Sequence, residues 1–271
     1  MKVVSPGRAG AAIVVLLGVA AAIGGCDGGL APRTTARAIS SSAGAARVGA
    51  ACLPLARSGK AVSFRSDDVS LAGVELGHGA TGVLLVHKST GDVCDWLTYA
   101  TELVRFGYQV LAFDSAGTGA SIERHHGGTP IEADVLAAVG HLRANGVSDV
   151  VLMGAEDGAA AMIVADTKLS PPAVALVGLS PPAILDGANM RATAYQVRSP
   201  QLYVTSDDDD PFSPQPPPGR SVGDLLTDGV GADLYNCPVG KHHGTDLLIG
   251  GCGVRIQSTI HDFLDRHAPA R

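Results

Sequence analysis

Aromatic residues and positive charge are both scarce in this sequence. Phenylalanine, tryptophan and tyrosine together make up 4% of its 271 residues, which argues against an aromatic surface on which sugars or bases stack. Lysine and arginine number 20 against 26 acidic residues, so that the net charge is −6. This balance gives nucleic-acid binding no electrostatic support, and we expect no nucleic-acid partner.

A transmembrane helix is not expected from the apolar stretch near the N-terminus. Ala11–Ile23 is too short to span a bilayer comfortably, and it follows the basic residues Lys2 and Arg8. It leads through two glycines to Cys26, which resembles the lipobox of bacterial lipoproteins, where the cysteine becomes the lipidated first residue. We interpret residues 1–26 as a lipoprotein signal peptide that anchors the mature chain through Cys26. An ordinary secretory signal with a chance cysteine is the alternative.

Residues 27–50 lack apolar periodicity and are rich in Gly, Ala, Ser and Thr. This composition predicts a flexible tether that holds a domain away from the membrane. The remainder, residues 51–271, is long enough for one globular domain with a substantial core. We therefore expect a membrane-anchored lipoprotein on the extracytoplasmic side of the cell envelope.

Cysteine is sparse, with 5 residues in the chain. Removing Cys26 leaves four, and export would allow these four to form disulfides. Four cysteines permit three pairings, among which the sequence alone cannot choose. Cys237 and Cys252 flank one loop between the last expected strand and the last expected helix. We predict that these two pair, and that Cys52 and Cys94 form the remaining disulfide.

Continuous apolar runs alternate with helical patterns along most of the chain. The expected strands are Val62–Arg65, Val69–Leu76, Val83–Val86, Gln109–Phe113, Asp149–Met153, Ala173–Leu179, Gln201–Thr205 and Ala232–Cys237. The expected helices are Trp96–Phe106, Ile131–Asn145, Gly158–Thr167, Leu185–Val197 and Val254–His267. The first two strands predict an antiparallel hairpin, and the alternation that follows predicts a mostly parallel, doubly wound α/β sheet without a large lid domain.

The stretch from Val150 to Ala161 is central to the site that we expect. It predicts a buried strand, a sharp turn flanked by Gly154 and Gly158, and a helix of small residues. This is the layout of the G-x-S-x-G nucleophile elbow, in which the glycines allow a strained turn and the middle residue stands at the carboxyl end of the strand. Here the middle residue is Glu156 and not serine.

Further motifs follow one another in a fixed order. His87 comes after the third strand, and the pattern D-x-x-G-x-G-x-S begins at Asp114 after the fourth. Pro200-x-Leu202 opens a strand that leads to Asp209, and His243-Gly244 precedes the last helix. Together with the elbow, these motifs make most of the chain resemble the α/β-hydrolase superfamily, near its small bacterial dienelactone-hydrolase and lipase members.

The resemblance implies a catalytic triad of Glu156, Asp209 and His243, in the chain order nucleophile, acid, histidine. Asp208 and Asp210 compete with Asp209 for the acid position, because all three lie in the acidic run after the same strand. That run lacks the glycine and the spaced ligands of a calcium-binding loop. We expect neither a metal nor a cofactor.

An oxyanion hole is implied beside the triad. Its two donors would be a backbone N–H near Lys88 and the N–H of Asp157, the residue that follows the elbow position. The carboxylates of Glu156 and Asp157 would weaken such an anion site, because like charges repel across the few ångströms involved.

The chemistry of Glu156 limits what the elbow can do. A glutamate cannot form the acyl-enzyme of a serine hydrolase productively. Members of the superfamily with a carboxylate nucleophile use the shorter aspartate, and a glutamate would misplace the attack by about 1 Å. They also carry a helical lid, for which there is little room between Leu179 and Gln201.

Three interpretations follow. The first is a hydrolase-fold lipoprotein, ancestrally an ester or acyl hydrolase, that has lost the serine mechanism and binds an ester-like small molecule or an envelope protein. The second is an active hydrolase that uses Glu156, as nucleophile or base, with His243 and Asp209. The third is an esterase that works through another serine, for which the candidates are Ser89, Ser115 and Ser121.

Overall fold

The computed structural model describes residues 52–124, 131–207, 227, 231–238 and 242–271. The expected signal peptide 1–26 with Cys26, the expected tether 27–50 and the candidate acids Asp208, Asp209 and Asp210 lie outside these residues. Within the described part of the chain, no helix combines the length and the apolar character needed to cross a membrane.

An eight-stranded sheet runs through the described domain in the order β1-β2-β4-β3-β5-β6-β9-β10. Its strands are β1 (Lys60–Ser66), β2 (Val69–Leu76), β3 (Thr81–Val86), β4 (Gln109–Phe113), β5 (Asp149–Ala155), β6 (Ala175–Leu179), β9 (Gln201–Ser206) and β10 (Asp233–Cys237). Strand β2 pairs antiparallel with both β1 and β4, and the other neighbouring pairs are parallel. The predicted hairpin and mostly parallel sheet are confirmed.

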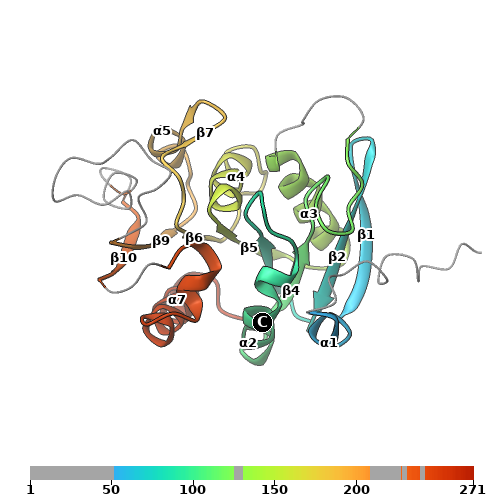
Figure 1. The fold of residues 1–271 in the computed structure, drawn as a ribbon, viewed down its shortest axis with the longest axis horizontal. Helices are drawn as coiled ribbons and strands as arrows, with labels where there is room; N and C mark the ends of the chain where they lie inside the picture. Colours follow the sequence, from blue (N-terminus) through green and yellow to red (C-terminus); the bar gives the residue numbers. More distant parts are fainter. Residues whose placement is uncertain (1–51, 125–130, 208–226, 228–230, 239–241) are drawn as a thin grey trace, which may run out of the picture. The chain divides into compact units, whose positions relative to one another are not determined.

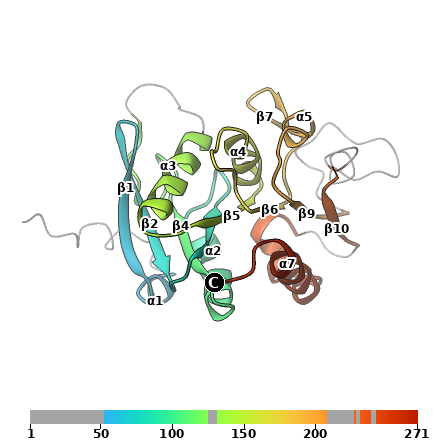
Figure 2. The same cartoon turned by 180° about the vertical axis from the view of Figure 1, so that it is seen from behind.

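Helices cover both faces of the sheet (Figures 1 and 2). They are α1 (Leu53–Ala56), α2 (Cys94–Arg105), α3 (Ile131–Ala144), α4 (Asp157–Asp166), α5 (Met190–Ala194) and α7 (Gly253–His267), together with the 3₁₀ helix η3 (Gly244–Leu248). The central strand β3 supplies Val83 and Leu85 to the core under α2 and α7, and Leu84 and Val86 to the core under α3 and α4. A strand buried on both faces explains why its sequence is a continuous apolar run.

The helix expected over Leu185–Val197 is wrong. The segment begins with a small hairpin of β7 (Ile184–Leu185) and β8 (Ala188–Asn189), and only Met190–Ala194 is α-helical. Asp186 and Gly187 form the turn, with φ of 49° and 81°. Two consecutive positive φ values are what a two-residue hairpin turn requires, and Asp-Gly is a favoured pair there. This turn therefore overrides the helical spacing of the apolar residues.

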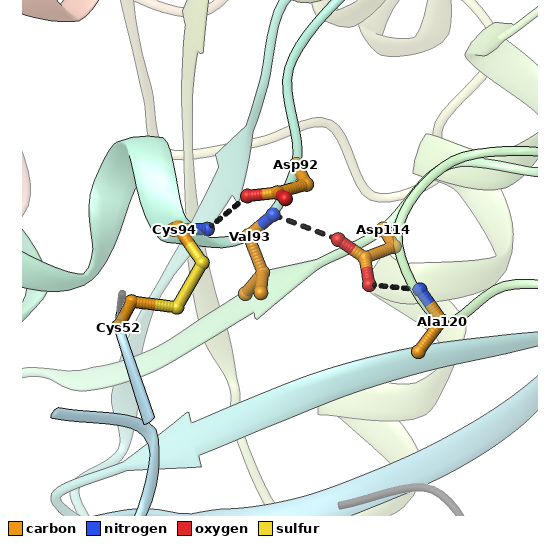
Figure 3. Close-up of a disulfide and its surroundings, with 6 residues drawn as sticks. All are labelled: Cys52, Asp92, Val93, Cys94, Asp114 and Ala120. Atoms are coloured by element: carbon orange, nitrogen blue, oxygen red, sulfur yellow. Dashed lines mark hydrogen bonds between the residues drawn. A yellow bond between two sulfur atoms is a disulfide. The ribbon is translucent and has the colours of Figure 1, made fainter. Parts of the chain in front are cut away.

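Both predicted disulfides are present. Cys237, the last residue of β10, is bonded to Cys252, the residue before α7. Cys52 is bonded to Cys94, the first residue of α2 (Figure 3). Helix α2 begins at Cys94 and not at Trp96, and the N–H of Cys94 donates to Oδ1 of Asp92 at 2.8 Å.

Candidate functional site

The turn between β5 and α4 has the strained geometry expected of the elbow. Glu156 lies there with φ 51° and ψ −121°, a conformation that costs a non-glycine residue of the order of 1–3 kcal/mol. A Cβ atom on Gly154 would come 2.6 Å from the carbonyl oxygen of Gly158, and one on Gly158 would come 2.5 Å from that of Val86. Both glycines are therefore needed for the close approach of strand, helix and neighbouring loop.

The Glu156 side chain is partly open to solvent, with 26% of its surface exposed. Its Oε1 atom lies 4.0 Å from Nζ of Lys88, which is 34% exposed. The backbone N–H of Glu156 donates to the carbonyl of Leu179 at 2.8 Å, which ties the turn to the end of β6. The main chain at this position is thus fixed, while the carboxylate remains accessible.

The expected oxyanion-hole residues also meet at the elbow. Ser89, next to Lys88, donates a 2.6 Å hydrogen bond from Oγ to the Asp157 carboxylate. The pair Lys88-Ser89 therefore lies along the pair Glu156-Asp157, and the loop after β3 meets the start of α4. The oxyanion hole itself stays a prediction. Two carboxylates stand beside the expected donors, which disfavours an anion at this place.

The loop that carries His243 reaches the elbow through its neighbour Gly244. A Cβ atom on Gly244, whose φ is 52°, would lie 2.8 Å from Oε1 of Glu156. The N–H of Gly244 donates to Oγ of Ser180 at 2.9 Å. Two of the three expected triad positions, Glu156 and His243, are thus carried by segments in contact. The third, Asp209, lies outside the described residues.

Ser180 is a residue that the sequence analysis missed. It follows β6 directly, and its φ of 50° places a non-glycine residue in the left-handed region. It is the neighbour of Glu156 across the sheet, because Ala155 pairs with Leu179. Strained residues at the carboxyl ends of two adjacent strands concentrate at functional sites. A serine that precedes a proline pair after a buried strand is the only signal that the sequence offers for it.

A buried aspartate joins the loops after β3 and β4. The Asp114 carboxylate accepts the N–H of Val93 at 2.7 Å and that of Ala120 at 2.8 Å (Figure 3). We call these three residues the Asp114 junction. Burial raises the pKa of Asp114 above its ordinary value, against the opposing effect of the two N–H donors. Each carboxylate oxygen accepts a backbone donor, as expected of an acid that organises loops.

His87 makes a second link between the same two loops. Its Nε2 accepts the N–H of Ser115 at 3.0 Å, so the ring proton is on Nδ1, which donates to the Lys88 carbonyl at 2.5 Å. The side chain is fully buried. This hydrogen bonding assigns His87 to loop organisation.

The three alternative serines differ in their surroundings. Ser121 donates from Oγ to the Asp114 carbonyl at 2.5 Å and accepts the N–H of Ala72 at 2.8 Å, so its hydroxyl is used by the fold. Ser89 donates to Asp157. Ser115 is 5% exposed, and its Oγ has no hydrogen-bond partner within the described structure. None of the three stands at the elbow.

Asp95 adds another carboxylate near Lys88. Burial raises the pKa of Asp95, and the charge of Lys88 acts in the opposite direction. Among the described residues, its Oδ2 atom is buried without a hydrogen-bond partner. Together with Glu156 and Asp157, this side chain makes the surroundings of Lys88 acidic.

No protein-family profile and no curated protein sequence matches this chain. Several solved structures do match this chain in fold. An esterase of Pyrococcus furiosus superposes with a TM-score of 0.68 at 19% identity, covering 81% of this chain and 97% of the other. A predicted hydrolase of Thermoplasma acidophilum gives 0.60 at 18% identity, covering 77% and 98%. A lidless α/β serine hydrolase of Xanthomonas campestris gives 0.59 at 18% identity, covering 77% and 94%.

These likenesses confirm the fold class. The chain has the α/β-hydrolase fold, with the antiparallel hairpin at the N-terminal edge of a mostly parallel sheet. At these identities the comparison concerns the fold alone, and the chemistry of the elbow has to be argued from its own residues.

Proposed function

We propose that this protein is an envelope lipoprotein with an inactivated ester-hydrolase site that now binds a ligand or a partner protein. Its ancestry is in ester or acyl hydrolysis, in keeping with the esterase and serine hydrolase that share its fold. The single observation that carries the proposal is that Glu156 occupies the strained elbow position. A carboxylate there removes the hydroxyl on which acyl-enzyme formation depends.

The charges around the elbow support loss of the serine mechanism. A tetrahedral intermediate carries a negative oxygen that needs donors in an environment free of competing anions. Here Glu156 and Asp157 are consecutive carboxylates, and the described cation beside them is Lys88, 4.0 Å from Glu156. Repulsion from two acids would raise the energy of the oxyanion even if another group supplied the nucleophile.

The strained backbone at Glu156 supports a continuing functional role for the turn between β5 and α4. The positive φ at residue 156 does not serve to bury the glutamate, because the Glu156 side chain is partly exposed. The turn presents the carboxylate at the carboxyl edge of the sheet, where open α/β sheets bind ligands. We therefore place the ligand or partner contact at Glu156, Lys88 and the His243 loop.

A second candidate function is hydrolysis with Glu156 itself as nucleophile or base. The contact between Gly244 and the Glu156 carboxylate favours it, because His243 is carried by the same loop. In that mechanism Glu156 would act with His243 and Asp209, and water would resolve any covalent ester.

Turnover of short acyl esters by three proteins separates these candidates. The wild type should be inactive, Glu156→Ser should gain slow hydrolysis, and Glu156→Gln should remain inactive. Wild-type turnover that Glu156→Gln abolishes would establish the glutamate mechanism in place of our proposal. Equal wild-type and Glu156→Gln turnover would point to another serine.

The membrane anchor is tested separately. Mass spectrometry of the mature N-terminus should show a lipid-modified Cys26. A soluble product cleaved elsewhere, with an unmodified cysteine, would contradict the lipoprotein part of the proposal without affecting the elbow.

A further inference from the structure

Two serine hydroxyls hold the main chain on both sides of His243. Ser206 donates from Oγ to the carbonyl of His242 at 3.0 Å. The N–H of Gly244 donates to Oγ of Ser180 at 2.9 Å. The His242 carbonyl belongs to the peptide group before His243, and the Gly244 N–H belongs to the peptide group after it. Each of the two peptide groups that flank His243 is therefore bound to one serine.

These two hydrogen bonds restrict the direction of the His243 side chain. A peptide group is planar, so a residue between two fixed peptide groups has little freedom left in φ and ψ. His243 has an extended backbone, with φ −127° and ψ 153°. Fixed φ and ψ determine the direction of the Cα–Cβ bond, from which the imidazole extends. The two serines thus act on the histidine through its main chain.

Both serines are themselves held by the sheet. Ser206 is the last residue of β9, is 1% exposed, and pairs with Cys237 of β10. Ser180 directly follows β6, and its N–H donates to the carbonyl of Val204 in β9 at 2.8 Å. The two hydroxyls therefore stand at the carboxyl ends of strands that are adjacent in the sheet (Figure 1). Groups carried by strands are placed more precisely than groups carried by loops.

The end of β6 is also joined to the elbow. The N–H of Glu156 donates to the carbonyl of Leu179, the residue before Ser180, at 2.8 Å. A Cβ atom on Gly244 would lie 2.8 Å from Oε1 of Glu156, so the His243 loop packs against the same turn. Glycine would adopt the φ of 50° at Ser180 without strain, and a hydroxyl-bearing residue there calls for a functional explanation.

We infer that Ser180 and Ser206 are positioning residues that hold His243 at the elbow. They act through the two peptide groups that flank the histidine, and neither needs to touch a ligand. The disulfide between Cys237 and Cys252 closes the same loop at its ends, whereas the two serines act next to His243 itself. This inference deepens the proposed function and rests on it, because the His243 loop is assigned there to the site.

The nuclear Overhauser effect (NOE) between the Hα protons of Gly244 and the side chain of Glu156 reports the position of the loop. The wild-type, isotopically labelled full chain should show it. Ser180→Gly removes the hydroxyl but accepts the φ of 50°, so the fold should keep its stability while the NOE weakens. The double variant Ser180→Gly with Ser206→Ala should lose the NOE.

Thr205→Val is the matched control. Thr205 precedes Ser206 in β9, is fully buried, and donates from Oγ1 to Oδ1 of Asn236 in β10 at 2.9 Å. Loss of that bond should destabilise the fold without moving the loop, so the NOE should remain. An NOE that persists in the folded double variant, is lost equally in Thr205→Val, or is missing from the wild type would overturn the inference.

Ester turnover in the Glu156→Ser background gives a second readout that stability alone would not move. Adding Ser180→Gly and Ser206→Ala should lower kcat by about a hundredfold, as for a reacting group misplaced by about 1 Å, with KM nearly unchanged. A raised KM with unchanged kcat would contradict the positioning role. If Glu156→Ser turns over no ester, the proposed function fails, and the NOE by itself still decides the role of the two serines.

Discussion

Two carboxylates follow β4 and β5, the strands on either side of the central strand β3, and have opposite surroundings. Asp114 follows β4, is buried, and accepts one backbone N–H on each oxygen. Glu156 follows β5, is partly exposed, and has Lys88 at 4.0 Å. The main chain at Asp114 needs no positive φ, whereas Glu156 has a φ of 51°. A fully bonded buried acid is explained by the fold, and an accessible acid on strained backbone calls for a functional explanation.

The largest expected effect is on the disulfide next to the Asp114 junction. Cys52 and Cys94 are 42 residues apart, and Cys94 directly follows Val93 of the junction. Chain entropy predicts that Cys52→Ala with Cys94→Ala lowers the free energy of unfolding by about 4 kcal/mol. The matched pair Cys237→Ala with Cys252→Ala, separated by 15 residues, should lower it by about 3 kcal/mol. Urea unfolding measures both, and the reverse order would contradict a chain-entropy origin.

The next largest expected effect on stability is the removal of the Asp114 carboxylate. Asp114→Ala leaves the N–H groups of Val93 and Ala120 without their acceptor, which should lower the free energy of unfolding by about 3 kcal/mol. Asp92→Ala is the comparison, because the described hydrogen bond to the Asp92 carboxylate is one N–H, that of Cys94, at 2.8 Å (Figure 3). Its effect should be about 1 kcal/mol. Equal losses from the two variants would show that the junction is not the main link between these loops.

Relief of the backbone strain at Glu156 should increase stability, in contrast to the preceding variants. Glu156→Gly accepts φ 51° without penalty, and should raise the free energy of unfolding by about 1 kcal/mol after the extra freedom of glycine in the unfolded chain is subtracted. Glu156→Ala retains the strain and serves as the control. If neither variant gains stability, the contrast between the two acids does not rest on backbone strain.

The smallest effect is a pH dependence at Asp95. Burial raises the pKa of this carboxyl in the folded state above 3.8, so its contribution to stability is fully present below pH 3.8 and declines as pH rises through the raised value. Asp95→Asn lacks that decline. Unfolding measured across this window should show the variant gaining on the wild type as pH rises. A difference that stays constant with pH would mean that Asp95 titrates normally.

The sequence was sufficient for features that depend on local pattern. The continuous apolar runs predict the central strands, and Gly154 and Gly158 predict the elbow because only glycine allows such close approach. The disulfide pairing followed from Cys237 and Cys252 at the two ends of one loop. In each case the physical constraint acts on residues near one another in the chain.

Features that depend on distant contacts were not predictable. The ion pair of Arg124 with Asp134 brings together a loop and α3, and its neighbours Asp67 and Asp68 come from the β1–β2 turn. The left-handed conformation of Ser180 depends on contacts with β9 and Gly244. Spacing alone also favoured a helix where Asp186-Gly187 forms a hairpin turn. The roles of Glu156 and His243 remain predictions of the site.

The most direct test of the lost serine mechanism is labelling with a fluorophosphonate probe, mapped by peptide mass spectrometry. The wild-type protein should show no labelled residue, because Glu156 offers no hydroxyl at the elbow. Glu156→Ser should be labelled at position 156, at least slowly, since the serine hydroxyl would then stand beside the His243 loop. Labelling of the wild type at Ser89, Ser115 or Ser121 would contradict the account and identify an active esterase.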